Sequence, residues 1–199
     1  MCLVIFTRFF DEVEFGILPH FCGKMPLKEF IRKTLKYRFR ARLKGAKKMK
    51  KILFCCWGNI CRSPMAEFIM KKKVEERGLT NEFYIESAAH SAEEIGNPVY
   101  PPAKKELARH GISCEGKRAR QITRADYDKW DLIIGMEKLN LGYMKRILGD
   151  DSEDKIHLLM EYAGTSEDID DPWYTGDFEG VYEQIERGCE GLLLHFGFK

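Results

Sequence analysis

The stretch ILFCCWGNICRSP, residues 52–64, places an apolar run directly before a turn that carries a cysteine and an arginine. Residues 51–55, KILFC, predict a short buried strand. Gly58 and Asn59 mark a turn, and Pro64 suits the first turn of a helix. The apolar face of that helix recurs at helical spacing, at Ala66, Ile69, Met70 and Val74. A strand that turns straight into a helix is typical of an α/β fold.

Strands and helices alternate along the rest of the chain. Three further strands are predicted, at 83–88, 131–136 and 155–159. Further helices are predicted at 101–111, 137–148 and 178–196. This alternation predicts a single α/β domain: a four-stranded parallel sheet with helices on both faces and a phosphate-binding loop after the first strand.

Composition bounds the class of protein. The 199 residues are 44% hydrophobic, which suffices for one α/β core, and no apolar run is long enough to cross a bilayer. The seven cysteines form no regular framework, and Cys55 and Cys56 are adjacent, which favours free thiols in a reducing compartment. We therefore expect a cytoplasmic protein.

Charge divides the chain in two. Residues 1–48 carry 12 Lys and Arg against 4 Asp and Glu, whereas residues 49–199 carry 21 against 27. We expect a single domain over 49–199, whose acidic balance disfavours binding to nucleic acid. The basic extension over 1–48 offers the chain's one expected contact with a membrane, through a basic amphipathic stretch. The favoured interpretation is a misassigned start, with Met49 as the true start and no stable fold before it.

The turn after the first strand predicts a cradle for an anion. Parallel sheets bind ligands where a strand's carboxyl end turns into a helix, and N–H groups of the turn reinforce the helix dipole there. Arg62 adds a planar fork of donors that matches a phosphoryl group. The same positive field favours the thiolate form of a cysteine at the start of the loop. These features together predict a phosphate-binding site that contains a cysteine nucleophile.

Cys56 is the favoured nucleophile, because five residues separate it from Arg62 and let the loop encircle an anion. Cys55 faces the opposite side of its strand and is interpreted as a buried thiol. Cys61 lies too close to Arg62 to stand across the loop from it. The three cysteines lack the paired spacing of a zinc site, so no metal is expected.

Attack on a phosphate ester expels an alkoxide or phenoxide, which needs a proton from a general acid. Residues 167–179, EDIDDPWYTGDFE, offer four aspartates: Asp168, Asp170, Asp171 and Asp177. Asp171 is favoured because Pro172 stiffens its turn, but capping of the last helix by Asp177 and simple solvation of the others stay open. Trp173 and Tyr174 follow as aromatic walls for a substrate ring.

Two motifs together, CWGNICRSP (56–64) and DPWYTGDF (171–178), resemble the low-molecular-weight protein tyrosine phosphatase family in its bacterial form. The likeness extends over residues 49–199. The segments SAAHSAEEIGNP (87–98) and ARQITRADYDKWDLIIGM (119–136) also resemble that family's middle part. The resemblance implies hydrolysis of phosphotyrosine in a protein or peptide, with phosphate or another oxyanion bound in the loop and no cofactor.

The resemblance also implies residue roles. Cys56 forms a phosphocysteine, Arg62 binds the phosphoryl oxygens, and Asp171 protonates the leaving group and then activates water. The phosphate-binding loop comprises Trp57, Gly58, Asn59, Ile60, Cys61 and Arg62. Asn59 holds the loop in shape, Ser63 supports the thiolate, and Ser87 belongs to the same network. Trp173, Tyr174 and Glu93 line the substrate mouth.

Several positions depart from the family pattern. Cys55 stands where an aliphatic residue is more usual, and Lys117 where many members place a histidine. Glu137 replaces a more frequent aspartate. Glu93 stands where some members place an aromatic wall, which leaves open the preference for aryl substrates.

Three alternatives stay open. Related protein arginine phosphatases typically carry threonine where this chain has Ile60. Arsenate reductases on this scaffold need a further close cysteine pair, and Cys114 stands alone. A non-catalytic phosphotyrosine-binding module would lack the nucleophile or the acid, and both are present.

Cys61 is expected to act as a redox partner. Peroxide attacks accessible thiolates first, and a loop that bends around an anion brings Cys61 near Cys56. A reversible Cys56–Cys61 disulfide is therefore expected under mild oxidation, provided that the two Cα atoms lie within roughly 7 Å.

Overall fold

The computed structural model describes residues 48–198. Its centre is one parallel sheet of four strands in the order β2-β1-β3-β4. The strands are Lys50–Cys56 (β1), Phe83–Ala89 (β2), Leu132–Gly135 (β3) and Ile156–Leu158 (β4). The predictions made for residues 1–47 lie outside the described part, and the domain boundary at residue 48 stays a prediction.

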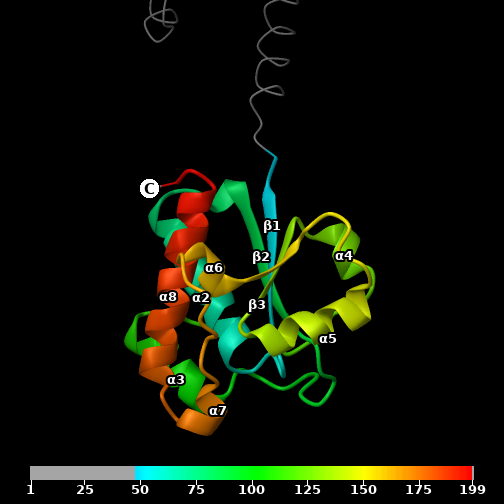
Figure 1. The fold of residues 1–199 in the computed structure, drawn as a ribbon. Coiled ribbons are helices and arrows are strands. Elements are labelled where there is room, and N and C mark those ends of the chain that lie inside the picture. Colours follow the sequence, from blue (N-terminus) through cyan, green and yellow to red (C-terminus); the bar gives the residue numbers. More distant parts are fainter. Residues whose placement is uncertain (1–47, 199) are drawn as a thin grey trace, which may run out of the picture. The chain divides into compact units, whose positions relative to one another are not determined.

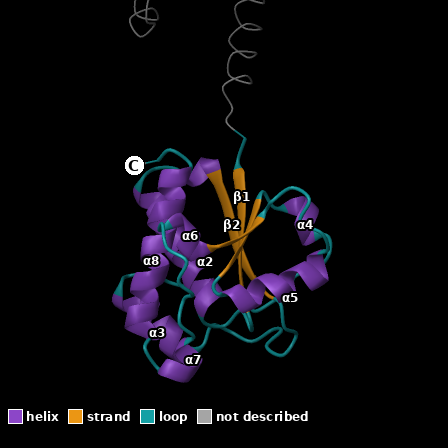
Figure 2. Cartoon of the chain, in the orientation of Figure 1, coloured by secondary structure: helices purple, strands orange, loops and turns teal. Residues whose placement is uncertain are grey.

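Helices cover both faces of the sheet (Figure 1). They are α2 (Arg62–Glu76), α3 (Pro101–Arg109), α4 (Asp126–Lys129), α5 (Lys138–Leu148), α6 (Leu159–Tyr162), α7 (Pro172–Thr175) and α8 (Phe178–His195), with a 3₁₀ turn at Thr80–Glu82. In Figure 2, α2 and α8 lie on one side of the strands, and α4 and α5 lie on the other. The predicted α/β architecture is confirmed.

Alternation along β1 divides its side chains between two cores. Ile52, Phe54 and Cys56 pack into the core beneath α2 and α8, whereas Leu53 and Cys55 pack into the core beneath α5. Successive side chains of a strand point to opposite faces, so the two adjacent thiols lie in different environments. The interpretation of Cys55 as a buried thiol on the opposite face is confirmed, because it is fully buried there.

No helix within residues 48–198 is both long and apolar enough to span a membrane.

Close packing of α6 on α8 depends on small residues. A Cβ added at Gly191 in α8 would lie 2.0 Å from the carbonyl oxygen of Tyr162, which is backbone and cannot turn away. By contrast, a Cβ added at Gly142 in α5 would meet nothing within 4 Å. The two helical glycines therefore provide a matched pair, one required by packing and one not.

Gly191→Ala is expected to lower the free energy of unfolding by about 1–3 kcal/mol, the usual cost of overpacking. Gly142→Ala is expected to raise it by up to about 1 kcal/mol, because alanine is the better helix former. Urea unfolding of the two variants beside the unchanged chain measures both. A Gly191→Ala variant at least as stable as the parent would contradict the packing described for α6 and α8.

Candidate active site

The loop between β1 and α2 directs its carbonyl groups outward. Three of them accept backbone N–H groups from neighbouring segments: Cys56 O from His90, Trp57 O from Ser91, and Ile60 O from Tyr100. Within the described chain, no acceptor takes the backbone N–H groups of residues 57–61. Those N–H groups stay available to an anion, and α2 begins directly after them.

The thiol of Cys56 contacts a serine at the other end of this loop. Its Sγ lies 3.1 Å from Ser63 Oγ. Asn59 Nδ2 donates to Ser63 Oγ at 2.9 Å and to Ser87 Oγ at 2.8 Å, and Ser87 Oγ lies 2.6 Å from Glu67 Oε2. A carboxylate only accepts, so Ser87 donates to Glu67, and the Ser63 hydroxyl keeps its own proton for Cys56 or a carbonyl.

Asn59 holds the tightest point of the loop. Its φ of 58° lies in the left-handed region that non-glycine residues seldom occupy. Its side chain makes three hydrogen bonds, two as donor to the serines and one as acceptor from the backbone N–H of Arg120 at 3.3 Å. These bonds fix the strained residue in place, as expected of a positioning residue.

Glu67 was not predicted, although it anchors this network. It is a buried carboxylate on α2, and Lys117 Nζ lies 2.8 Å from its Oε2. Lys117 also donates to the carbonyl of Ser87 at 2.9 Å, and Lys71 pairs with the second carboxylate oxygen at 2.5 Å. Lys117, which departs from the family's usual histidine, therefore supports the loop through Glu67 and Ser87. An acidic residue amid the apolar face of α2 was the available signal.

Arg62 is buried at the first position of α2, with 2% of its side chain exposed. Its Nη2 lies 2.6 Å from Asp171 Oδ2 and 2.9 Å from Glu137 Oε1, and its Nη1 donates to the carbonyl of Ile169 at 3.2 Å. Burial lowers the pKa of Arg62, but the charges of Cys56, Asp171 and Glu137 outweigh it, so the pKa is raised overall. The guanidinium stays charged.

Asp171 is the aspartate that the structure brings to the loop. Its Oδ1 accepts the N–H of Trp173 at 3.1 Å and caps α7, while its Oδ2 contacts Arg62. Pro172 stands at the first position of this helix, where its fixed φ suits the turn. The carboxyl is thus held at the phosphate loop from a distant segment of the chain.

The other three candidate acids have structural partners. Asp177 caps α8 by accepting the N–H of Gly180 at 2.8 Å. Asp168 accepts the N–H of Lys138 at 2.9 Å, and Asp170 accepts from Gln184 at 3.2 Å. The alternative that Asp177 caps the last helix is confirmed.

The residues predicted to line the substrate mouth differ in their exposure and in their contacts. Trp173 and Tyr174 are 56% and 85% exposed, and the Trp173 ring lies 5.1 Å from that of Tyr100. The carboxylate of Glu93 is not free to face a substrate, because it is hydrogen-bonded to Trp57. Its Oε2 accepts the indole N–H of Trp57 at 2.9 Å, which holds that ring where it is 43% exposed. Trp57 supplies an aromatic surface beside the loop that the sequence did not assign.

A second network of residues reaches Arg62 from α5. Asn140 Nδ2 donates to Glu137 Oε1 at 3.1 Å and lies 3.2 Å from His90 Nε2. His90 stacks on Tyr143 with ring centroids 4.8 Å apart. Burial, and to a lesser degree the charge of Arg62, lower the pKa of His90 to about 4. The spacing of Glu137 and Asn140 resembles a capping box, a signal that could have found this pair.

Cys61 lies buried in the loop as a free thiol. Burial, followed by the charge of Cys56, raises its pKa to about 12. Thiol–disulfide chemistry proceeds through thiolates, so this environment slows attack by Cys61 itself. The Cys56–Cys61 disulfide stays a prediction.

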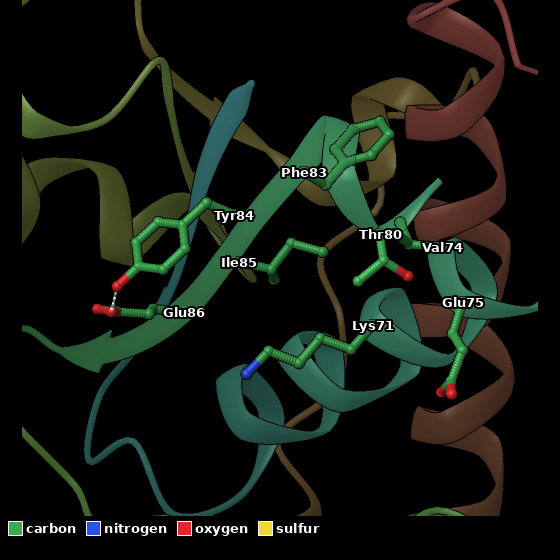
Figure 3. A pocket seen from close by; sticks show the side chains of 8 residues that line it. All are labelled: Lys71, Val74, Glu75, Thr80, Phe83, Tyr84, Ile85 and Glu86. Carbon is green, nitrogen blue, oxygen red and sulfur yellow. Dashed lines mark hydrogen bonds between the residues drawn. The ribbon is translucent and has the colours of Figure 1, made fainter. Parts of the chain in front are cut away.

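Elsewhere the described residues offer no comparable chemistry. Among residues 48–198, no three His, Cys, Asp or Glu side chains gather in a way that could hold a metal ion. A hollow of about 470 Å³ lies between α2 and the outer strand β2 (Figure 3). Its polar lining groups include Lys71, Glu75 and Glu86, and it shares no residue with the phosphate loop.

Comparison with known proteins decides the family. The family described as low molecular weight phosphotyrosine protein phosphatase matches residues 51–197. This chain belongs to that phosphatase family. The low molecular weight protein-tyrosine-phosphatase YfkJ of Bacillus subtilis (strain 168) is 41% identical over 147 residues, which cover 73% of this chain and 94% of that protein.

Solved structures agree with this membership of the phosphatase family. The crystal structure of YfkJ matches with a TM-score of 0.73 at 39% identity, covering 77% of this chain and 98% of that one. The crystal structure of DARP, a Drosophila arginine phosphatase, matches with a TM-score of 0.67 at 32% identity, covering 74% and 98%. The sequence resemblance to the low molecular weight phosphatase family is thereby confirmed.

His90 gives a prediction about pH. Its pKa is lowered to about 4 in the folded state, against about 6.5 when unfolded, so the unfolded chain binds an extra proton between these values. His90 therefore costs the folded state up to about 3 kcal/mol as pH falls from 6.5 to 4. A His90→Gln variant should gain stability relative to the parent over this window, as measured by urea unfolding at pH 7, 5.5 and 4.5.

The difference between the two proteins at pH 8 serves as the control, because both side chains are neutral there. A constant difference from pH 8 to pH 4.5 would contradict the buried, neutral state of His90.

Proposed function

We propose that this chain is a protein-tyrosine phosphatase that hydrolyses phosphotyrosine in a protein or peptide through a phosphocysteine on Cys56. The main support for this proposal is that three reactive groups lie together at one loop. A thiol, a buried guanidinium and a carboxyl converge there from β1, α2 and the segment before α7. The available N–H groups of residues 57–61 complete a cradle for the phosphoryl oxygens.

In the first step, the Cys56 thiolate attacks phosphorus while the bond to the tyrosine oxygen breaks. Asp171 gives its proton to that oxygen, so the leaving group departs as neutral tyrosine. The Ser63 hydroxyl stabilises the thiolate by a hydrogen bond, because Asn59 donates to the Ser63 oxygen and leaves the Ser63 proton for the Cys56 sulfur. Arg62 and the loop N–H groups stabilise the negative charge on the phosphoryl oxygens.

In the second step, a water molecule attacks phosphorus and the sulfur–phosphorus bond breaks. Asp171, now a carboxylate, takes the proton from that water, and the Cys56 thiolate is restored as phosphate leaves. Glu137 keeps Arg62 paired during both steps, because its contact of 2.9 Å does not involve Asp171. The reaction needs no metal or cofactor, because N–H groups and a guanidinium supply the electrostatic stabilisation.

Aromatic residues beside the loop favour an aryl ester as substrate. Trp173 and Tyr174 lie exposed next to Asp171, and Trp57 follows Cys56 directly. An apolar Ile60 stands where the resemblance places threonine in arginine phosphatases. DARP, an arginine phosphatase, nevertheless shares this fold, so phosphoarginine is the substrate against which the proposal must be tested.

Substitutions at the three proposed catalytic residues have distinct expected outcomes. Cys56→Ser should abolish turnover of para-nitrophenyl phosphate, and Arg62→Ala should nearly do so. Asp171→Ala should lower kcat for a phosphotyrosine peptide, whose leaving group does need a proton, by ~10²–10⁴, the usual contribution of general acid catalysis. Addition of a metal chelator should leave every rate unchanged.

Initial rates across this set measure all four effects, with Asp177→Ala as the matched control for loss of an aspartate from the same segment. Full activity of Cys56→Ser would overturn the mechanism. A loss in Asp177→Ala as large as that in Asp171→Ala would overturn the assignment of the acid.

Substrate class is tested with one peptide carrying phosphotyrosine, phosphoserine or phosphoarginine. Phosphotyrosine should give the highest kcat/KM, because its ring contacts the aromatic residues and its phenolic oxygen is a better leaving group than the serine alkoxide. Release of phosphate measures the three rates. A higher kcat/KM for phosphoarginine would replace the proposed activity with that of an arginine phosphatase.

A further inference from the structure

A small hollow on α5 lies outside the proposed catalytic machinery. It measures about 210 Å³ and is lined by Lys138, Leu139, Gly142, Tyr143 and Arg146. Lys138, Gly142 and Arg146 follow at intervals of four residues, so they lie along one stripe of the helix. Gly142 contributes no side chain at the middle of that stripe. The hollow is therefore open at its centre and flanked by a cation at either end.

The two cations are not paired with carboxylates. Within residues 48–198, ion pairs form at Arg120, Lys129 and Lys155, but none forms at Lys138 or Arg146. Arg146 lies over the ring of Tyr143, 5.3 Å from its centroid. Asp168 accepts the backbone N–H of Lys138, and the carboxylate of Glu137 is directed to Arg62. Both cationic groups remain available to an anion from outside.

An aromatic layer joins this hollow to the phosphate loop. The ring of Tyr143 lies 5.6 Å from that of Trp57 at 82°, and Trp57 follows Cys56 in the chain. A continuous row of contacts therefore leads from the Trp57 ring to the Tyr143 ring, 5.6 Å between centroids, and on to the Arg146 guanidinium, 5.3 Å from the Tyr143 centroid. An extended peptide rises about 3.3 Å per residue, so it covers this path in roughly three to four residues.

Two segments beside the loop are acidic. Residues 165–179 carry six Asp and Glu and no Lys or Arg, and Glu93 and Glu94 stand in the segment after β2. Like charges repel, so an acidic peptide segment is disfavoured along these sides and favoured toward α5. Along α5, by contrast, the hollow offers two cations to the substrate.

We propose that this hollow binds an acidic side chain of the substrate, three to four residues from the phosphotyrosine. The inference rests on the proposed phosphatase function and adds a preference for acidic sequences around the phosphorylated residue. The carboxylate lies between Lys138 and Arg146, and Tyr143 and Leu139 contact its methylene groups. The hollow discriminates between substrates and takes no part in the chemical step.

The test uses pairs of phosphotyrosine peptides that differ by one residue, Glu or Gln, placed in turn at each position up to four residues on either side. The unchanged full chain should favour Glu over Gln in kcat/KM by about two- to fivefold at one position three or four residues away, the range expected for exposed ion pairs. That preference should diminish at high salt, which screens surface charges.

Variants of the hollow should abolish the preference without affecting hydrolysis of para-nitrophenyl phosphate. Arg146→Gln removes one cation, and Gly142→Leu fills the hollow from a position with free space around its Cβ. Lys145→Gln is the matched control, because it removes one charge from the same helix outside the hollow lining. Lys145→Gln should keep the preference for Glu.

Binding of the same peptides to the Cys56→Ser full chain separates the two proposals. If no peptide is hydrolysed but Cys56→Ser prefers the Glu peptide, the function fails and the hollow stands. If phosphotyrosine is hydrolysed with equal kcat/KM for every pair, the inference about the hollow is overturned and the function stands. A preference that survives in both Arg146→Gln and Gly142→Leu also overturns it.

Discussion

A buried guanidinium that must be paired organises the active site. Arg62 stands at the start of α2 with almost no exposure, and leaving such a charge unpaired costs about 3–5 kcal/mol. Its partners are Asp171, more than a hundred residues further along the chain, and Glu137 at the N-terminus of α5. The pairing therefore draws the acid-bearing segment and α5 against the phosphate loop. The same contacts that satisfy the charge place the proposed acid at the thiol's loop.

A second line of polar contacts supports the loop from beneath. It runs from Lys117 through Glu67, Ser87, Asn59 and Ser63 to the thiol of Cys56. The Glu67 carboxylate accepts from Ser87, and the Asn59 amide donates to both serines, so the Ser63 proton is left for the thiol or a carbonyl.

The elements of the fold could be predicted from sequence because they depend on local patterns. Apolar periodicity predicted the four strands and the long helices α2, α3, α5 and α8, but not the four-residue helices α4, α6 and α7. The spacing of Cys56 and Arg62 indicated the phosphate loop. The contacts of His90, Glu67 and Trp57 depend on which segments meet in three dimensions, and no local pattern encodes that. Glu93 shows the difference most clearly: its position at the mouth was predicted, but its hydrogen bond to the Trp57 indole required the folded structure.

The proposed mechanism requires that the phosphoryl group is transferred to the sulfur of Cys56 before water releases it. The Asp171→Ala variant lacks the proposed base of the second step, so it should accumulate the intermediate when mixed with para-nitrophenyl phosphate, whose leaving group needs little protonation. Mass spectrometry after an acid quench, with fragmentation of the peptide that contains Cys55, Cys56 and Cys61, locates the phosphoryl group. We expect one phosphoryl group, on Cys56. A phosphoryl group on another residue, or turnover without any protein-bound phosphate, would contradict it.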